Sequence, residues 1–439
     1  MSEKLSIHAF RIQKLYVNGI NREALAFIKQ RVKNANHKLL GALMLDEMAI
    51  RQHIEYDGKQ FVGYYDVGNN ITNEECSIAK EALVFLVVGI NELWKIPVAY
   101  FLINGINGEQ KANLIIQCLS LLHDCGIHIK TVTRDGAACN LSMFRSLQCN
   151  MDPEHLQTWF VDHISKSKIY VFLDPCHMVK LLRNIFGDYK NIKNKNNENI
   201  SWEYIVSLHE LQQNKGLHMG NKLRTGHIEY HKKKMNVRFA AQIFSSSVAN
   251  ALQMCRSVLH IDKFAQSEAT EEFLQMMNDL FDIFNSRNLR QKFYERPINP
   301  DNYESVLYKL KECKEYLLNL KFENGQLVVR SNRKTGVLGF LINIESLKML
   351  YQDICDKEQI LPYIPLYQIS QDHLEIFFGC IRAFGRQNNN PTVRQFKAAF
   401  KRLLLRTEIK GATTGNCIAL DDIPILNATY TITTRGSNK

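Results

Sequence analysis

The chain has 439 residues, of which 45% are hydrophobic and 23% charged, enough apolar side chain for a large core divided over two or three domains. Its formal net charge of +11 favours an anionic partner, nucleic acid first, although a merely soluble basic protein is equally compatible with charge alone. The 11 cysteines include no C-x-x-C pair, which argues against a disulfide framework and a zinc knuckle and fits the reducing interior of a nucleus or cytosol. The longest apolar stretch, Ala82 to Ile90, is too short to span a bilayer.

The first hundred residues predict a short helical lead-in followed by strands. Residues 1–38 have helical character and carry no recognisable chemistry. Apolar and β-branched runs then predict four strands, at Leu40–Leu45, Phe61–Asp66, Ala82–Ile90 and Val98–Ile103. Asp57-Gly58 favours a tight hairpin turn between the first two runs, so these strands are expected to be sequential and antiparallel.

Helices and strands alternate after residue 104. Apolar residues at 112, 115, 116, 119 and 122 predict an amphipathic helix over Gly108–Cys125, ended by Gly126. The next predicted elements are a strand His128–Thr133, a helix Ala137–Leu147, a strand Lys168–Leu173 and a helix His177–Phe186. This order predicts an α/β fold with a mixed sheet flanked by helices, the order of the ribonuclease H fold, in which the first and fourth strands are neighbours.

The second half of the chain is mostly helical. Residues 188–204 form a polar stretch that should be exposed, and helices dominate from 205 to about 360. Further helices fill 371–405, interrupted before Pro391, and the last predicted helix, Thr392–Leu405, carries a basic face. That face, formed by Arg394, Lys397, Lys401 and Arg402, suits phosphate groups, although a solvated charged face is an equal alternative.

Three acids lie where buried segments end or turn. Asp46 follows the predicted strand Leu40–Leu45, Asp135 lies just after the predicted strand His128–Thr133, and Glu375 lies in a late helix. A buried carboxylate is costly unless it is paired, and Mg²⁺ or Mn²⁺ prefers hard oxygen ligands. Two such ions can activate a hydroxyl and stabilise the leaving oxygen of a phosphodiester, with Asp46 as the ligand shared by both ions. Because the chain has 44 acids, the triplet is only a hypothesis on this basis.

Five stretches resemble the P element and THAP-type transposases, in the order that family has them. They are Leu45-Asp46-Glu47-Met48, Thr133-Arg134-Asp135-Gly136, Asp174 to Asn184, Leu280 to Arg287, and Gln371 to Phe378 with Asn389-Asn390-Pro391-Thr392. The resemblance covers roughly residues 20–405. It implies a ribonuclease H-like catalytic domain interrupted by a large helical insertion, and DDE chemistry in which Asp46, Asp135 and Glu375 hold magnesium. DNA ends would be cut by water and then joined to target DNA.

The resemblance also implies GTP as a bound, unhydrolysed cofactor. No P-loop motif is present, so the nucleotide would bind by another route. Asp372, one helical turn before Glu375, is our candidate for accepting hydrogen bonds from the guanine base. Asp282, Asn285 and Lys234 are further candidates, for which a helix cap and a solvated charge run are the alternatives. Asp174 and His177 are expected to support the metal site without binding the ions.

The predicted organisation follows from the pattern and the resemblance together. The expected parts are a lead-in at 1–38, the catalytic domain at 39–187, a GTP-binding insertion at 188–360, the final catalytic helices at 361–409 and a flexible tail at 410–439. Members of the family usually begin with a zinc-binding THAP domain, whereas the first cysteine here is Cys76. We therefore expect a nuclear, self-associating transposase core that binds DNA and GTP. The alternative is a truncated or domesticated copy that binds DNA or nucleotide without catalysis.

Overall fold

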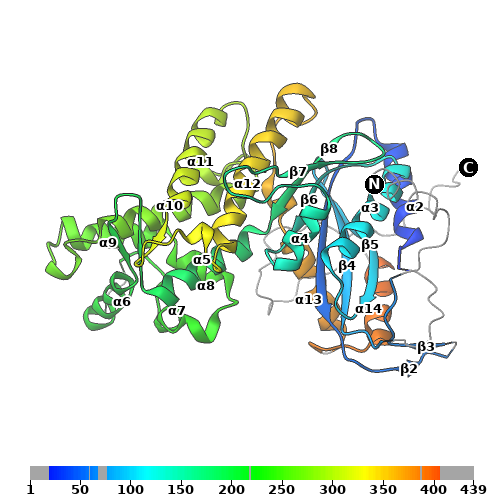
Figure 1. Ribbon diagram of the computed structural model, residues 1–439, viewed down its shortest axis with the longest axis horizontal. Coiled ribbons are helices and arrows are strands. Elements are labelled where there is room, and N and C mark those ends of the chain that lie inside the picture. The colour runs from blue at the N-terminus through cyan, green and yellow to red at the C-terminus, as the bar shows by residue number, and fades with distance from the viewer. Residues whose placement is uncertain (1–18, 59, 68–76, 217–218, 386–387, 406–439) are drawn as a thin grey trace, which may run out of the picture.

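The computed structural model describes residues 19–58, 60–67, 77–216, 219–385 and 388–405. Its centre is a six-stranded mixed sheet in the order β5-β4-β1-β6-β8-β7 (Figure 1). The strands are β1 Leu40–Ala49, β4 Glu81–Gly89, β5 Lys95–Ile103, β6 His128–Arg134, β7 Trp159–Val161 and β8 Lys168–Leu173. The sheet core is therefore formed by the apolar runs that the sequence marks as strands.

The strand pairing explains the near-continuous apolar sequence of β1. This strand is antiparallel to β4 on one side and parallel to β6 on the other, so it is covered on both edges and both faces. The predicted neighbourhood of the first and fourth core strands is confirmed. The short edge strand β7, antiparallel to β8, was not predicted.

The hairpin turn was predicted correctly, but its strands were not. Gly58 has φ +101°, and the backbone N–H of Asp57 donates to the Gln60 carbonyl at 3.0 Å. The turn joins β2 Glu55–Tyr56 to β3 Phe61–Val62, and these two strands form a separate two-stranded sheet. The predicted strand Phe61–Asp66 is therefore not a strand of the central sheet. The partner of β1 is β4 instead, because the buried run at 81–89 can cover it along its whole length and the polar hairpin cannot.

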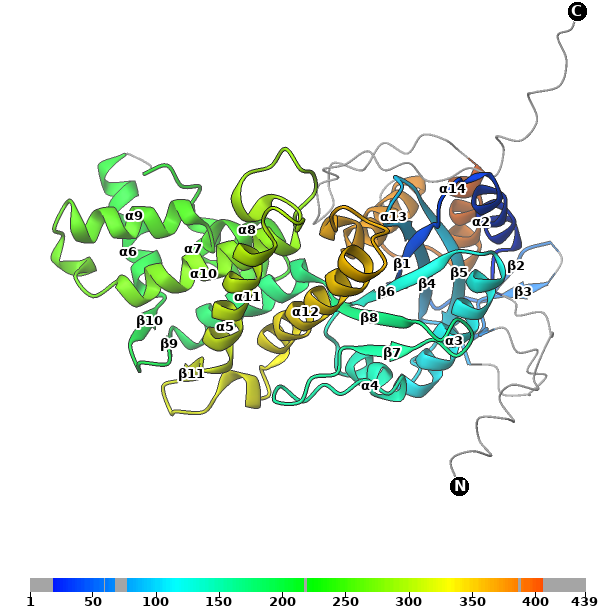
Figure 2. The same ribbon diagram turned by 90° about the horizontal axis from the view of Figure 1, so that it is seen from above.

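Helices cover both faces of the sheet. In Figure 2, α3 and α4 lie on one side of the sheet and α13 and α14 on the other, whereas α12 packs alongside β8. These helices, with α2 beside β5, are α2 Arg22–Asn34, α3 Gly108–Asp124, α4 Ala138–Ser146, α12 Thr335–Tyr351, α13 Asp372–Phe384 and α14 Val393–Leu405. The predicted break before the last helix is confirmed, and residues 410–439, predicted to be a tail, lie outside the described residues.

A helical lobe extends from one end of the sheet (Figures 1 and 2). Helix α5, Pro175–Tyr189, leads from β8 into it. The lobe contains α6 Glu203–Lys215, α7 Thr225–Ile228, α8 Val237–Ile243, α9 Ser246–Ser257, α10 Glu268–Phe284 and α11 Tyr303–Leu318. No helix in the described part of the chain is long and apolar enough to cross a membrane.

The polar stretch 188–204 is more ordered than its composition indicates. It contains β9 Asn191–Lys193 and β10 Asn199–Ser201, which form a three-stranded sheet with β11 Lys321–Phe322. Ile192 and Ile200 are buried in it. The prediction of an exposed loop was wrong because two isolated apolar residues, spaced to share one sheet face, are enough to anchor the segment.

Helix α12 fixes the end of the helical lobe to the sheet. The side chain of Asn343 donates to the Leu173 carbonyl at 2.7 Å and accepts from the Leu173 amide at 2.8 Å, so it continues the hydrogen bonding of β8. Gly136 lies at the same junction, where an added Cβ would fall 2.3 Å from the Thr335 side chain. The glycine after Asp135 is thus required by close packing of protein against protein.

Candidate active site

Asp46 lies beside Asp135, which directly follows the parallel strand β6; Asp46 does not lie at the end of its own strand as predicted, because β1 continues to Ala49. The register pairs Met44 of β1 with Thr133 of β6, and Asp46 and Asp135 each lie two residues further along the chain. Both carboxylates are partly exposed at this edge of the sheet. Burial raises the pKa of Asp46 to about 7; the Arg134 charge opposes the rise, and the Asp135 and Glu47 charges add to it.

Glu47 faces the opposite side of the sheet from Asp46, as alternation along a strand requires. It pairs with Lys111 of α3 at 2.7 Å and hydrogen-bonds the guanidinium of Arg134. Both cations are buried. Burial by itself would raise the pKa of Glu47, but the charges and hydrogen bonds of Arg134 and Lys111 lower it overall.

Asp135 is held by a side-chain network that begins at the same lysine. Lys111 Nζ donates to Asn140 Oδ1 at 3.1 Å, and Asn140 Nδ2 donates to Asp135 Oδ1. The backbone N–H of Ala137 also donates to Asp135 Oδ1 at 3.2 Å. Since Lys111 and Asn140 are buried, one carboxylate oxygen of Asp135 has a fixed position.

Glu375 lies in the first turn of α13, a helix that contacts β1. Gln371, at the start of this helix, donates from its side chain to the Leu45 carbonyl of β1 at 3.3 Å, which ties the helix to the strand that carries Asp46. His177 lies close enough to both Asp135 and Glu375 for each charge to raise its pKa, although burial and Lys180 lower that pKa overall. The predicted triad thus lies around the junction of β1, β6, α5 and α13.

A tighter group lies beside the triad. Asp174 caps α5, accepting from the His177 amide at 2.8 Å and the Gln371 amide at 3.4 Å. Asp174, Cys176 and Asp372 are all buried, and one side-chain oxygen or sulfur atom from each lies within 4.8 Å of the other two. No other group of three or more His, Cys, Asp or Glu residues in the described ranges meets this criterion. The oxygens of Asp46, Asp135 and Glu375 do not converge that closely. Burial, with the charges of Asp372 and Glu375, raises the pKa of Asp174 well above its usual value.

The predicted nucleotide residues fall in three places. Asp282 lies in the last turn of α10, where burial, with Glu295, raises its pKa to about 7, and Asn285 caps that helix. Lys234 is exposed and pairs with Asp188 of α5 at 3.3 Å. Asp372 is the first residue of α13 and is only 5% exposed.

Contacts connect the end of α10 to the start of α13. The Tyr367 amide donates to the Ser286 carbonyl at 3.0 Å, and the Arg287 guanidinium lies 3.9 Å from the centre of the Tyr367 ring. His373 Nε2 lies 3.1 Å from the Tyr367 carbonyl. The structure thus brings Asn285 into the neighbourhood of α13. Buried polar atoms without a hydrogen-bond partner among the described residues gather here: Ser286 Oγ, Gln368 Oε1, Ser370 Oγ, Gln371 Oε1 and His373 Nδ1.

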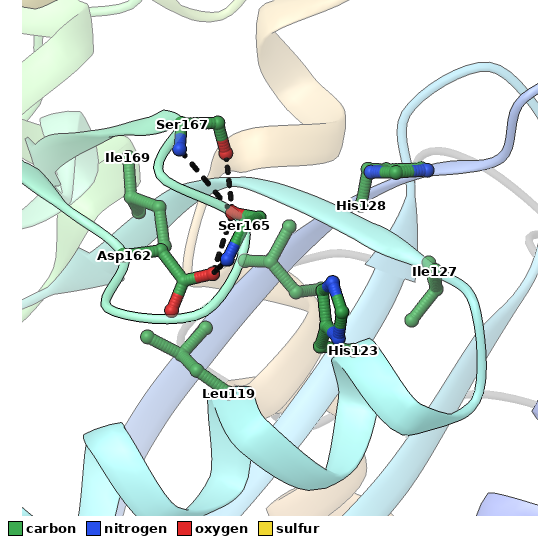
Figure 3. A pocket seen from close by; sticks show the side chains of 9 residues that line it. Leu119, His123, Ile127, His128, Asp162, Ser165, Ser167 and Ile169 are labelled. Carbon is green, nitrogen blue, oxygen red and sulfur yellow. Dashed lines mark hydrogen bonds between the residues drawn. The ribbon is translucent and has the colours of Figure 1, made fainter.

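A small hollow elsewhere does not belong to this site. His123, His128 and Asp162 line it, at the start of β6 and therefore at the opposite end of that strand from Asp135 (Figure 3). Asp162 is already used in the hollow, where it accepts hydrogen bonds from the amide and hydroxyl of Ser165.

Sequence reasoning missed Lys111, Asn140, Cys176 and Gln371. Only Lys111 carries a signal, because it lies four residues before Ile115 on the buried stripe of α3, where an unpaired lysine is unfavourable. The roles of the other three depend on which segments pack together.

Three comparisons with known proteins fit this geometry. Models of the TNP-like family match residues 16–148 as the RNase H N-terminal domain, 176–297 as the GTP-binding insertion domain and 367–401 as the RNase H C-terminal domain. The Homo sapiens protein "DNA transposase THAP9" is 31% identical over 414 residues, 93% of this chain and 45% of that protein. The Drosophila melanogaster "Transposable element P transposase" is 26% identical over 397 residues, 86% of this chain and 47% of that protein.

The fold also matches a solved structure, the "Drosophila P element transposase strand transfer complex", with a TM-score of 0.72 and 24% identity over 92% of this chain and 84% of that one. This likeness supports a ribonuclease H-like mixed sheet with a helical insertion. The chain spans about half the length of the two relatives named above. By its three domain models and these relatives, the chain belongs to the P element and THAP-type transposase family.

Proposed function

We propose that this chain is the catalytic core of a DNA transposase that cuts DNA and joins the cut end to target DNA, using divalent metal and bound GTP. The observation that carries the proposal is the adjacency of Asp46 and Asp135 on parallel strands, with the Glu375 helix tied to β1. Further acids lie close to these residues, and a set of carboxylate ligands fits Mg²⁺ or Mn²⁺. We further propose that the protein acts in the nucleus and as an assembly of copies.

In this proposal Asp46, Asp135 and Glu375 hold the metal, which when bound activates the attacking hydroxyl and stabilises the leaving oxygen of the phosphodiester. Asn140 keeps one oxygen of Asp135 in place. Gln371 maintains the position of α13 against β1, and with it the position of Glu375. Asp174 and His177 act indirectly, Asp174 by capping α5 and receiving the Gln371 amide.

GTP would bind between the end of α10 and the start of α13, with Asp372 accepting hydrogen bonds from the guanine N1 and N2 groups. The buried polar atoms without partners near Tyr367 support a polar ligand there. Because Asp372 is nearly inaccessible, binding requires the contact between α13 and Asp174 to open. Asp282, Asn285 and Lys234 remain predictions for the rest of the site, and Lys234 would have to leave Asp188.

The first test is nicking of supercoiled plasmid DNA and strand transfer by the full chain, with and without Mg²⁺. We expect activity that requires the metal and falls to background in Asp46→Ala. Asp124→Ala is the matched control, because this exposed aspartate lies at the far end of α3. A wild-type protein that binds DNA but never cuts it, with Asp46→Ala indistinguishable, would favour the non-catalytic alternative.

The nucleotide proposal is tested separately by displacement of a fluorescent GTP analogue. We expect GTP to compete and ATP not to. Asp372→Asn should weaken the binding of GTP and strengthen the binding of xanthosine triphosphate. The carboxylate accepts a hydrogen bond from the guanine amino group, whereas the amide of the variant can donate one to the xanthine O2. Unchanged GTP binding in this variant would mean that the base is recognised elsewhere.

A further inference from the structure

An exposed pair of aromatic side chains lies on the β2–β3 hairpin. Tyr56 is 55% exposed and Phe61 66% exposed, although both are large apolar residues. They are direct cross-strand partners, and their ring centres are 5.5 Å apart. The next residue, Val62, is buried, so the hairpin presents one face to the core and the aromatic face to solvent.

The hairpin is held on a fixed base. Gly63, directly after β3, has φ +122°, and an added Cβ there would lie 2.3 Å from the His53 carbonyl oxygen. The Ala79 amide donates to the Gly63 carbonyl at 2.9 Å. Such close backbone packing gives the aromatic pair a defined orientation, which lowers the entropic cost of binding a planar ligand.

Two arginines lie where the hairpin joins the start of α14. The Arg51 amide donates to the Pro391 carbonyl at 2.9 Å, and the Arg394 amide donates to a carboxylate oxygen of Glu55 at 3.3 Å, so the hairpin is joined to the start of α14. Both arginine side chains are exposed. The hairpin also follows β1 at the end of the strand that carries Asp46, and it projects from the side of the molecule opposite the helical lobe (Figures 1 and 2).

We infer that this hairpin and the start of α14 form a stacking surface for unpaired DNA bases, with Tyr56 and Phe61 contacting the bases and Arg51 and Arg394 the adjoining phosphates. Aromatic rings beside arginines are the usual means of binding unpaired nucleotides without sequence preference. DNA is preferred to a second copy of the chain as the occupant, because a protein of net charge +11 attracts an anionic ligand. The inference rests on the proposed function, since it takes DNA as the ligand.

The test compares two DNA probes with the full chain. One is a duplex with a central gap of a few unpaired nucleotides, one of them 2-aminopurine, and the other is the fully paired duplex. We expect wild type to bind the gapped probe more tightly and to quench 2-aminopurine by stacking. The double variant Tyr56→Ala, Phe61→Ala should lose about tenfold or more in affinity for the gapped probe, lose the quenching, and bind the paired duplex as wild type does.

Two controls separate stacking from general loss of apolar surface. Tyr56→Phe keeps a ring and should keep gapped-probe affinity and quenching. Phe293→Ala removes an aromatic side chain that is 89% exposed in the helical lobe and should change neither. Circular dichroism checks that the variants fold.

Three results would overturn the inference. The first is unchanged affinity of the double variant for the gapped probe, and the second is an equal loss of this affinity in Phe293→Ala. The third is a double variant that differs from wild type only in its sedimentation coefficient, which would assign the surface to contact between copies of the chain. Wild type that binds neither DNA probe would overturn the proposed function as well. Wild type that binds both probes, with an unaffected double variant, would overturn the stacking surface alone.

Discussion

Asp46 and Glu47 are adjacent in sequence and have opposite electrostatic environments. Glu47 points to one face of the sheet, where Arg134 and Lys111 lower its pKa. Asp46 points to the other face, where burial and neighbouring acids raise its pKa to about 7. Strand alternation therefore places Glu47 in the Arg134–Lys111 network and places Asp46 on the face where we propose that metal binds.

The contrast extends beyond these two residues. On the Glu47 face, two buried cations pair with Glu47. On the Asp46 face, Asp174 lies near Asp372 and Glu375, and its pKa stays raised although the Lys180 charge opposes the rise. The difference shows that the ratio of acids to cations at a site indicates its role better than the number of charged residues does. An excess of buried acids is stable only where a cation or another ligand is expected.

The largest expected effect is the loss of stability when Glu47 no longer pairs with the buried cations on its face of the sheet. Glu47→Gln leaves the fully buried Arg134 without its carboxylate, and we expect the free energy of unfolding to fall by about 3 kcal/mol. Urea denaturation followed by circular dichroism measures it. Asp152→Asn, which removes an exposed partner of Arg330, is the control and should change stability little. Equal stability of the two variants would show that the Glu47 network is not structural.

The next largest effect concerns Asn140, which connects Lys111 on the Glu47 face to Asp135 beside Asp46. Asn140→Ala removes the side chain that joins Lys111 to Asp135, and we expect metal affinity to fall about 10- to 100-fold. Mn²⁺ titration followed by electron paramagnetic resonance measures this without relying on catalysis. Asn319→Ala, at the end of α11, should leave Mn²⁺ binding unchanged. Wild-type affinity in Asn140→Ala would mean that Asp135 needs no such support.

Sequence patterns predicted the sheet and its helices well, because buried strands and amphipathic helices have strong periodicity. The β1–β6 pairing, the α13–α14 break and the strand that ends before Asp174 all follow from local sequence. The role of Asp46, Asp135 and Glu375 as a metal-binding triad stays a prediction, made partly through resemblance to a family. What local sequence did not show was that Phe61–Asp66 leaves the central sheet, since short apolar runs fit either arrangement.

The site's supporting residues depend on contacts between distant segments. Asn140 is unremarkable in its own helix, and only the approach of α3 gives it a lysine partner. Asp372 and Asp174 are 198 positions apart in sequence, and Cys176 joins them only after α13 docks at the start of α5. Lys111 is the exception, because a lysine on an apolar helical stripe already indicates a buried acid nearby.

The smallest expected effect is the pH dependence of stability that arises from Asp46. The folded-state pKa of Asp46 is raised from 3.8 to about 7, so the folded protein keeps a proton that the unfolded chain releases between these values. Its stability should therefore fall as pH rises through this window, with the full penalty above pH 7.

Asp46→Asn removes that penalty. Without metal, we expect the variant to be more stable than wild type by about 1 kcal/mol at mildly alkaline pH, with the difference shrinking as the solution is acidified. Thermal denaturation across pH measures it, and added Mg²⁺ should stabilise wild type more than the variant, because an ionised carboxylate binds the ion more strongly than a neutral amide does. Glu81→Gln is a useful comparison, since burial raises the pKa of that half-buried acid in β4 as well. A difference between Asp46→Asn and wild type that grows toward acid pH would reverse the sign and show that Asp46 is already paired.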